Sequence, residues 1–168
     1  VSGAGLIGGG TFPKPGEVSL AHNGVLFLDE LTEFSRHTLD LLRQPMEEKV
    51  VNIARANITL KFPSDFILLA AMNPCLCGYL GDSNRECSCS MGSILKYRSK
   101  ISGPLLDRID LQSEMLNMTY EELNFSQKGE TSHIIRERVL LARDRQLNRF
   151  NLDATHNNSN MSHGEVEK

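Results

Sequence analysis

Two adjacent carboxylates, Asp29 and Glu30, are the residues of this sequence best placed to do chemistry. They come directly after Val25-Leu26-Phe27-Leu28, four apolar residues without polar alternation, which predicts a strand buried on both faces of a parallel sheet. Ligands of open α/β sheets bind at the carboxyl ends of such strands. The pair therefore suits magnesium-dependent phosphoryl transfer, in which one carboxylate helps to hold the ion and the other polarises a water molecule. An acidic turn after a core strand is the alternative.

A second apolar run ends in the same way. Residues 67–72 are continuously apolar and lead into Asn73-Pro74, so a second buried strand is expected to carry a polar side chain at its carboxyl end. An Asn-Pro pair by itself usually marks a turn. Two such ends in one small domain favour a ligand site at one edge of the sheet.

A cation follows further along the chain, where Arg108 lies between Asp107 and Asp110 after a short apolar segment. The functional interpretation is an arginine presented to a phosphate. The alternative is an arginine that forms ion pairs with nearby acids.

Four cysteines form a C-x-C pair, a nine-residue spacer and a second C-x-C pair: Cys75, Cys77, Cys87 and Cys89. Four thiolates suit tetrahedral zinc, and the pattern predicts a structural site that holds the loop together without catalysing a reaction. Four reduced thiols in a polar loop remain the alternative.

The elements that must position these groups are short. Two β-rich runs, 50–55 and 58–62, predict a hairpin. Ser35 is expected to cap a helix over about 36–44 that Pro45 ends. A helix is also expected over 93–100.

The two ends of the chain differ from its centre. Residues 1–16 are rich in Gly and Pro and are expected to form a loop outside the core. A polar linker is expected over 119–128, an amphipathic helix over 131–150, and a tail over 151–168 that is too polar to build a core. The predicted domains are therefore residues 1–117 and 118–168.

The 168 residues include 18 basic and 21 acidic side chains, giving a net charge of −3. That balance argues against a surface devoted wholly to nucleic acid but not against a local basic patch. No apolar run approaches the roughly 20 residues that a membrane span needs, so a cytoplasmic location and no membrane partner are expected. Because the chain starts with Val-Ser-Gly-Ala-Gly, it is expected to be part of a longer protein.

Three stretches together resemble the magnesium-chelatase-like AAA+ ATPases, and in particular their competence-protein (ComM/YifB-type) branch. They are PGEVSLAHNGVLFLDE over 15–30, AAMNPC over 70–75 and ISGPLLDRIDL over 101–111. The resemblance implies an α/β fold: part of an AAA+ P-loop-type core with a parallel sheet flanked by helices, a β-hairpin insertion and the start of an α-helical lid.

The resemblance also implies roles for four of these residues. Asp29 and Glu30 match the Walker B pair, with Asp29 in the Mg²⁺ shell and Glu30 as the base that polarises water. Asn73 matches sensor 1, and Arg108 matches the arginine finger that reaches the ATP of a neighbouring subunit. That last role implies a ring of identical subunits, expected to be a hexamer.

Two departures from the family pattern limit what this chain is expected to do alone. No G-x-x-x-x-G-K-[ST] motif occurs in it, so the phosphate-cradling Walker A loop is missing. The lid also ends before the helix that would carry sensor 2. The parent protein is expected to be an ATPase, and the 168-residue chain is expected to be inactive.

The hypothesis that fits these features best is an ATP- and Mg²⁺-dependent motor that acts on DNA as a helicase or branch-migration factor. One alternative is a chelatase motor that inserts Mg²⁺ into a tetrapyrrole, against which the cysteine loop argues. Another is a non-enzymatic, zinc-stabilised module that binds a partner.

Overall fold

The computed structural model describes residues 2–10, 13–55, 58–82, 84–115, 129–149, 158 and 161–166. By its internal packing the chain divides into two units, residues 1–117 and 118–168, and each is described by itself. The hairpin turn at 56–57, the linker over 119–128 and most of the tail over 151–168 lie outside the described residues.

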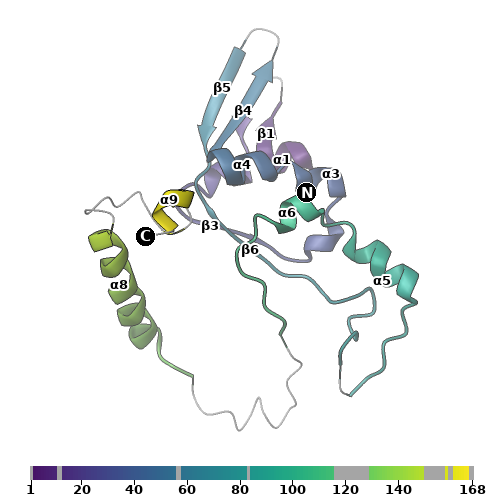
Figure 1. Ribbon diagram of the computed structural model, residues 1–168. Helices are drawn as coiled ribbons and strands as arrows, with labels where there is room; N and C mark the ends of the chain where they lie inside the picture. The colour runs from purple at the N-terminus through teal and green to yellow at the C-terminus, as the bar shows by residue number, and fades with distance from the viewer. Residues whose placement is uncertain are drawn as a thin grey trace. The chain divides into compact units, whose positions relative to one another are not determined.

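The centre of the first unit is a parallel pair of strands, β3 (Val25–Leu28) and β6 (Ile67–Ala70), which lie side by side in Figure 1. Val25 is opposite Ile67 and Leu28 is opposite Ala70, so both strands end at the same edge. A parallel pair with short helices before and after it confirms the predicted α/β class.

The prediction that these strands are buried on both faces is wrong for the described residues. Leu26 and Leu28 are buried, whereas Val25 and Phe27 are 56% and 55% exposed. Successive side chains of a strand point to opposite faces, and the described helices cover only the face that carries Leu26 and Leu28.

Short helices surround the covered face. They are α2 (Glu17–Leu20), the 3-10 helix η1 (Leu31–Glu33), α3 (Arg36–Asp40) and α4 (Arg43–Glu48). Their apolar residues join those of the strands in one hydrophobic core, which consists of Leu6, Val18, Leu26, Leu28, Leu31, Leu39, Leu42, Val51, Ile53, Ile101 and Leu105.

The expectation of a loop outside the core over residues 1–16 is also wrong. Helix α1 (Gly3–Ile7) places Leu6 in the core at 1% exposure, and β1 (Gly8–Gly9) pairs antiparallel with β2 (Lys14–Pro15). Burial of Leu6 outweighs the low helix propensity of the glycines. Gly16 permits the close backbone approach, because a Cβ there would lie 2.3 Å from the Gly8 nitrogen.

Ser35 caps a helix as predicted, and its Oγ accepts from the Thr38 backbone N–H at 3.1 Å. The predicted end at Pro45 is wrong, because Pro45 lies inside α4. Pro45 is the third residue of that helix, within the first turn, where backbone N–H groups have no intrahelical acceptor. A proline there costs no helical hydrogen bond.

The predicted hairpin is confirmed. Strand β4 (Val50–Arg55) pairs antiparallel with β5 (Ile58–Pro63) and projects from the rest of the first unit in Figure 1. The helix expected over 93–100 is found as α5 (Met91–Arg98), which is capped by Ser90. Helix α6 (Gly103–Leu106) follows.

The second unit contains α8 (Ser132–Arg149) and α9 (His163–Val166). Helix α8 agrees with the helix expected over 131–150, but none of its residues is buried. Among the described residues, no helix is both long and apolar enough to cross a membrane.

Candidate functional site

The carboxylate pair lies where β3 ends, and the backbone of both strands holds it there. The Ala71 N–H donates to the Leu28 carbonyl at 2.9 Å, and the Leu31 N–H donates to the Ala71 carbonyl at 2.9 Å. These bonds continue the ladder past the strands and fix the path of Asp29 and Glu30 between them.

Glu30 adopts a left-handed conformation, with φ 49° and ψ 48°. Its backbone N–H donates to Asp29 Oδ1 at 2.8 Å, a local bond of the kind that lets an aspartate turn the chain. Left-handed geometry is uncommon for a residue other than glycine and often occurs at functional positions. One oxygen of Asp29 is therefore held by the backbone, and among the described residues no hydrogen bond or ion pair occupies the other.

Both carboxylates are exposed and line an open cleft of about 310 Å³. The other residues of the cleft are Glu33, Phe34, Ser35 and Thr38. The hydroxyls of Ser35 and Thr38 lie 2.8 Å apart, so part of the cleft lining is polar. Mg²⁺ binds to proteins through one or two carboxylates and keeps several water ligands, which an open cleft with exposed carboxylates allows.

Asn73 is exposed and lies three residues beyond the end of β6. Because β3 and β6 are parallel and in register, it follows the same sheet edge as Asp29 and Glu30. It is not among the residues that line the cleft.

Arg108 lies away from this cleft. Its guanidinium forms an ion pair with Glu47 of α4 and donates to the Pro104 carbonyl. In the described part of the chain its acidic partner is thus Glu47, not the neighbouring Asp107 or Asp110. The structure does not bring Arg108 to the carboxylate pair of its own chain.

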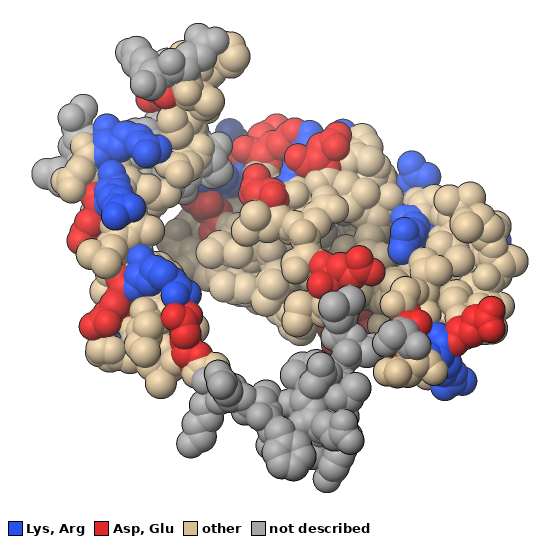
Figure 2. All heavy atoms as spheres, turned by 60° about the horizontal axis from the view of Figure 1, so that its bottom comes forward, with Lys and Arg blue, Asp and Glu red and all other residues tan. Residues whose placement is uncertain are grey.

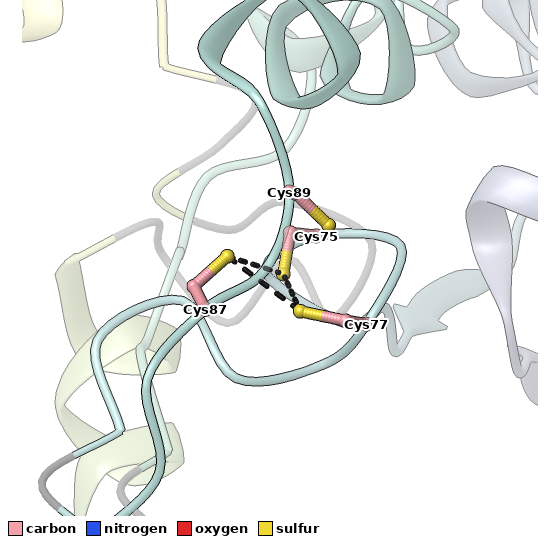
Figure 3. A group of neighbouring side chains, drawn as sticks. All are labelled: Cys75, Cys77, Cys87 and Cys89. Carbon is pink, nitrogen blue, oxygen red and sulfur yellow. Dashed lines mark hydrogen bonds between the residues drawn. The ribbon is translucent and has the colours of Figure 1, made fainter.

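The four cysteines come together in the segment between β6 and α5 (Figure 3). The Sγ atom of Cys75 lies 3.4 Å from that of Cys77 and 3.6 Å from that of Cys87, and the last two are 3.5 Å apart. All four Sγ atoms, that of Cys89 included, lie within 4.8 Å of one another. All four are free thiols.

The local sequence makes the segment fold back. Gly78 and Gly81 have φ values of 81° and 86°, which side chains other than glycine rarely adopt. The Asp82 Oδ1 accepts from the backbone N–H groups of Asn84 and Arg85 at 2.7 and 3.2 Å. The Arg85 guanidinium also stacks over the Tyr79 ring at 4.0 Å.

The pKa values of Cys77 and Cys87 shift in opposite directions although their sulfur atoms are close together. The backbone N–H of Tyr79 lowers the pKa of Cys77 to about 5, against the effect of desolvation. The pKa of Cys87 is raised to about 12: the Cys89 backbone N–H favours its thiolate, but desolvation and the neighbouring sulfurs of Cys77 and Cys75 outweigh that bond. Four thiolates this close repel one another unless a cation lies between them.

Charged side chains of both signs are mixed on one face of the molecule (Figure 2). On the face shown in Figure 2, the Lys and Arg side chains of the described residues are interspersed with Asp and Glu. This agrees with the near-balanced composition of 18 basic and 21 acidic residues.

The comparison with known proteins settles the family. Residues 1–123 match the model of the family described as magnesium chelatase, subunit ChlI. The chain belongs to this family. The fold, a parallel α/β pair with flanking helices, is consistent with part of an AAA+ core.

Relatives of known name place the chain within the competence-protein branch. It is 51% identical over 146 residues to competence protein ComM of Haemophilus influenzae, covering 86% of this chain and 28% of that protein. It is 46% identical over 154 residues to YifB of Escherichia coli, covering 87% and 29%. A more distant match, 29% identical over 138 residues, is DNA replication licensing factor mcm6 of Dictyostelium discoideum, covering 82% of this chain and 14% of that protein.

The chain therefore spans less than a third of the length of the curated relatives it matches. The structure places the predicted residues Asp29 and Glu30 at the cleft and brings the four cysteines together, whereas Glu33 in the cleft and Glu47 beside Arg108 were not predicted. Glu33 follows Glu30 by three residues, and its backbone N–H donates to the Glu30 carbonyl at 2.7 Å, so the turn after β3 keeps it at the cleft. Nothing in the local sequence indicated Glu47.

Proposed function

We propose that this chain is part of an ATP-hydrolysing AAA+ motor that acts on DNA. The observation that carries the proposal is the shared edge of β3 and β6, at which Asp29, Glu30 and Asn73 follow the ends of two in-register parallel strands. In a chain of the magnesium-chelatase family, polar groups at that edge suit a bound phosphate and its metal ion.

The residues present fit a magnesium ion. Asp29 and Glu30 offer exposed carboxylates in an open cleft, and the backbone occupies only one oxygen of Asp29. We assign Asp29 to the metal, which when bound neutralises phosphate charge. We assign Glu30 to the polarisation of the attacking water and Asn73 to its orientation.

Arg108 takes the role of an arginine finger that acts on the nucleotide of a neighbouring subunit. In its own chain Arg108 pairs with Glu47 and does not line the cleft. This position is consistent with a function between chains. The role requires a ring of identical subunits, and a hexamer is the assembly we propose for the parent protein.

The chain carries the water-activating side of the site and no Walker A motif. We therefore propose that the 168 residues alone do not turn over ATP. Turnover by the purified chain above that of its Glu30→Gln variant would contradict this.

The experiment that tests the proposal measures ATP hydrolysis by the full-length protein, with and without single-stranded or branched DNA. We expect Glu30→Gln to abolish hydrolysis while ATP binding persists, because the amide cannot accept the water proton. Glu17→Gln, at an exposed carboxylate of α2, is the matched control and should retain wild-type activity. DNA-independent hydrolysis would remove the DNA motor from the proposal.

The hairpin of β4 and β5 is where we place a contact with DNA. Lys61 is exposed on it, so Lys61→Ala should weaken DNA binding and lower the salt dependence of binding by about one phosphate contact. Lys96→Ala, at an exposed lysine of α5, serves as the control. Equal effects of the two changes would mean that the hairpin has no special role.

The same assays on the full-length protein test two other functions. A chelatase motor would be stimulated by a tetrapyrrole substrate and not by DNA. A non-enzymatic, zinc-stabilised module would bind its partner without any ATP turnover by the full-length protein.

A further inference from the structure

The cysteine cluster has the dimensions of a mononuclear metal site. In a tetrahedral site with metal–sulfur bonds of about 2.3 Å, neighbouring sulfur atoms lie about 3.8 Å apart. Three of the separations here are 3.4, 3.5 and 3.6 Å, and no pair exceeds 4.8 Å. Figure 3 shows the sulfur atoms of Cys75, Cys77 and Cys87 grouped together, with the Cys89 side chain beside them.

The same distances disfavour two other forms that four cysteines can take, a disulfide and a four-iron cluster. A disulfide requires a sulfur–sulfur bond of about 2.05 Å, and the closest pair is at 3.4 Å. In a four-iron cluster each cysteine binds a different iron, which spreads the sulfur atoms more widely than here. Hard ions such as Ca²⁺ and Mg²⁺ prefer oxygen ligands, whereas thiolates favour zinc.

The surroundings suit a closed structural site. Cys75 is fully buried and the other three cysteines are partly buried. Backbone N–H groups of Leu80 and Tyr79 interact with the sulfurs of Cys75 and Cys77. Such bonds orient metal ligands and offset the negative charge of a four-thiolate site.

We propose that Cys75, Cys77, Cys87 and Cys89 bind one structural Zn²⁺ that fastens the carboxyl end of β6 to the start of helix α5. Four protein ligands complete the tetrahedron and leave no open position for catalysis. The inference goes beyond the proposed function, because metal binding by these thiols does not depend on ATP hydrolysis.

The position of the ligands explains what the ion would hold. Cys75 comes two residues after Asn73, and Cys89 directly precedes Ser90, the cap of α5. At the other end of α5, the Arg98 Nε donates to the Pro74 carbonyl at 3.2 Å. The segment that carries Asn73 is thus attached to both ends of α5: to its start through the zinc ion and to its end through Arg98.

The test is metal analysis of the full-length protein, purified anaerobically without added zinc. We expect about one zinc per chain. Replacement by Co²⁺ should give the charge-transfer and intense d–d absorption of tetrahedral cobalt bound to four thiolates. The cobalt spectrum is read on the wild-type sequence, so it does not depend on whether a variant folds.

Variants locate the ion. Cys77→Ser should lower the zinc content and weaken the cobalt charge-transfer band, whereas Ser88→Ala should change neither. Ser88 lies between two of the ligands and is exposed, so it controls for disturbance of the loop. Loss of one ligand in Cys77→Ser should also loosen the loop. Limited proteolysis would then cleave the variant faster than the wild type between residues 75 and 89.

Several results would overturn the proposal. They are a zinc content near that of a protein without a site, iron in place of zinc, a disulfide between any two of the four cysteines in the anaerobic protein, or cobalt absorption that lacks thiolate bands. None of these measurements reads ATP turnover, so failure here and failure of the motor proposal are distinguishable.

Discussion

Replacement of Arg108 by alanine separates a catalytic arginine from a structural one. In this chain the guanidinium is 22% exposed and pairs with Glu47, which is 52% exposed. If Arg108 serves only to hold α6 against α4, its loss should reduce stability and leave hydrolysis nearly intact. If it is an arginine finger, hydrolysis should collapse.

The expected loss of stability and the expected loss of rate differ greatly in size. An ion pair with one half-exposed partner contributes about 1 kcal/mol or less, so Arg108→Ala should leave the protein folded. Loss of an arginine finger costs about 10³ to 10⁵ in rate. Glu47→Gln breaks the same ion pair and keeps the arginine, so it should show the small stability loss without the loss of rate.

The decisive assay mixes two inactive variants of the full-length protein. Subunits with Arg108→Ala keep Glu30, and subunits with Glu30→Gln keep Arg108. If base and finger come from different subunits, then after random mixing at equal amounts about a quarter of the interfaces pair an intact base with an intact finger. We therefore expect hydrolysis to recover to about a quarter of the wild-type rate.

Two outcomes would refute the reasoning. A mixture as inactive as its components would mean that Arg108 does not act on a neighbouring subunit. An Arg108→Ala protein that retains hydrolysis close to that of Glu47→Gln would mean that Arg108 is structural. Size-exclusion chromatography of each variant confirms that rings still form.

The remaining predictions concern the packing of the first unit, and urea unfolding measures each. Leu39→Ala should lower the free energy of unfolding by about 2 to 5 kcal/mol because Leu39 is fully buried, whereas Leu20→Ala, at a residue 68% exposed, should change it little. Gly16→Ala should cost about 1 to 3 kcal/mol because its Cβ would meet backbone atoms, and Gly92→Ala, with nothing within 4 Å, should stabilise α5 by about 0.5 to 1 kcal/mol. Ser102→Ala should cost about 1 to 2 kcal/mol, because the buried Ser102 hydroxyl donates at 2.5 Å to a carboxylate of α3. Equal effects within either pair, or an unchanged midpoint for the serine variant, would contradict the described packing.

Local sequence determined much of the fold because the interactions involved span only a few residues. The apolar runs before Asp29 and Asn73 indicated two strands, and the runs around 56–57 indicated a hairpin. Ser35 indicated the start of a helix because a serine hydroxyl can accept from the backbone N–H three residues ahead, here that of Thr38. The sequence predictions were wrong where tertiary packing determines the local structure. Residues 1–16 were expected to form a loop, but burial of Leu6 stabilises a helix in this glycine-rich segment.

The sequence by itself determined the chemical groups of this protein: a carboxylate pair and an asparagine after two apolar strands, an arginine, and four paired cysteines. Only the tertiary structure decided their neighbours. It joined Arg108 to Glu47, opened the cleft beside Asp29, and brought the two cysteine pairs within 4.8 Å. Such contacts join residues far apart in the chain, and they depend on how the intervening elements pack, which no local pattern encodes.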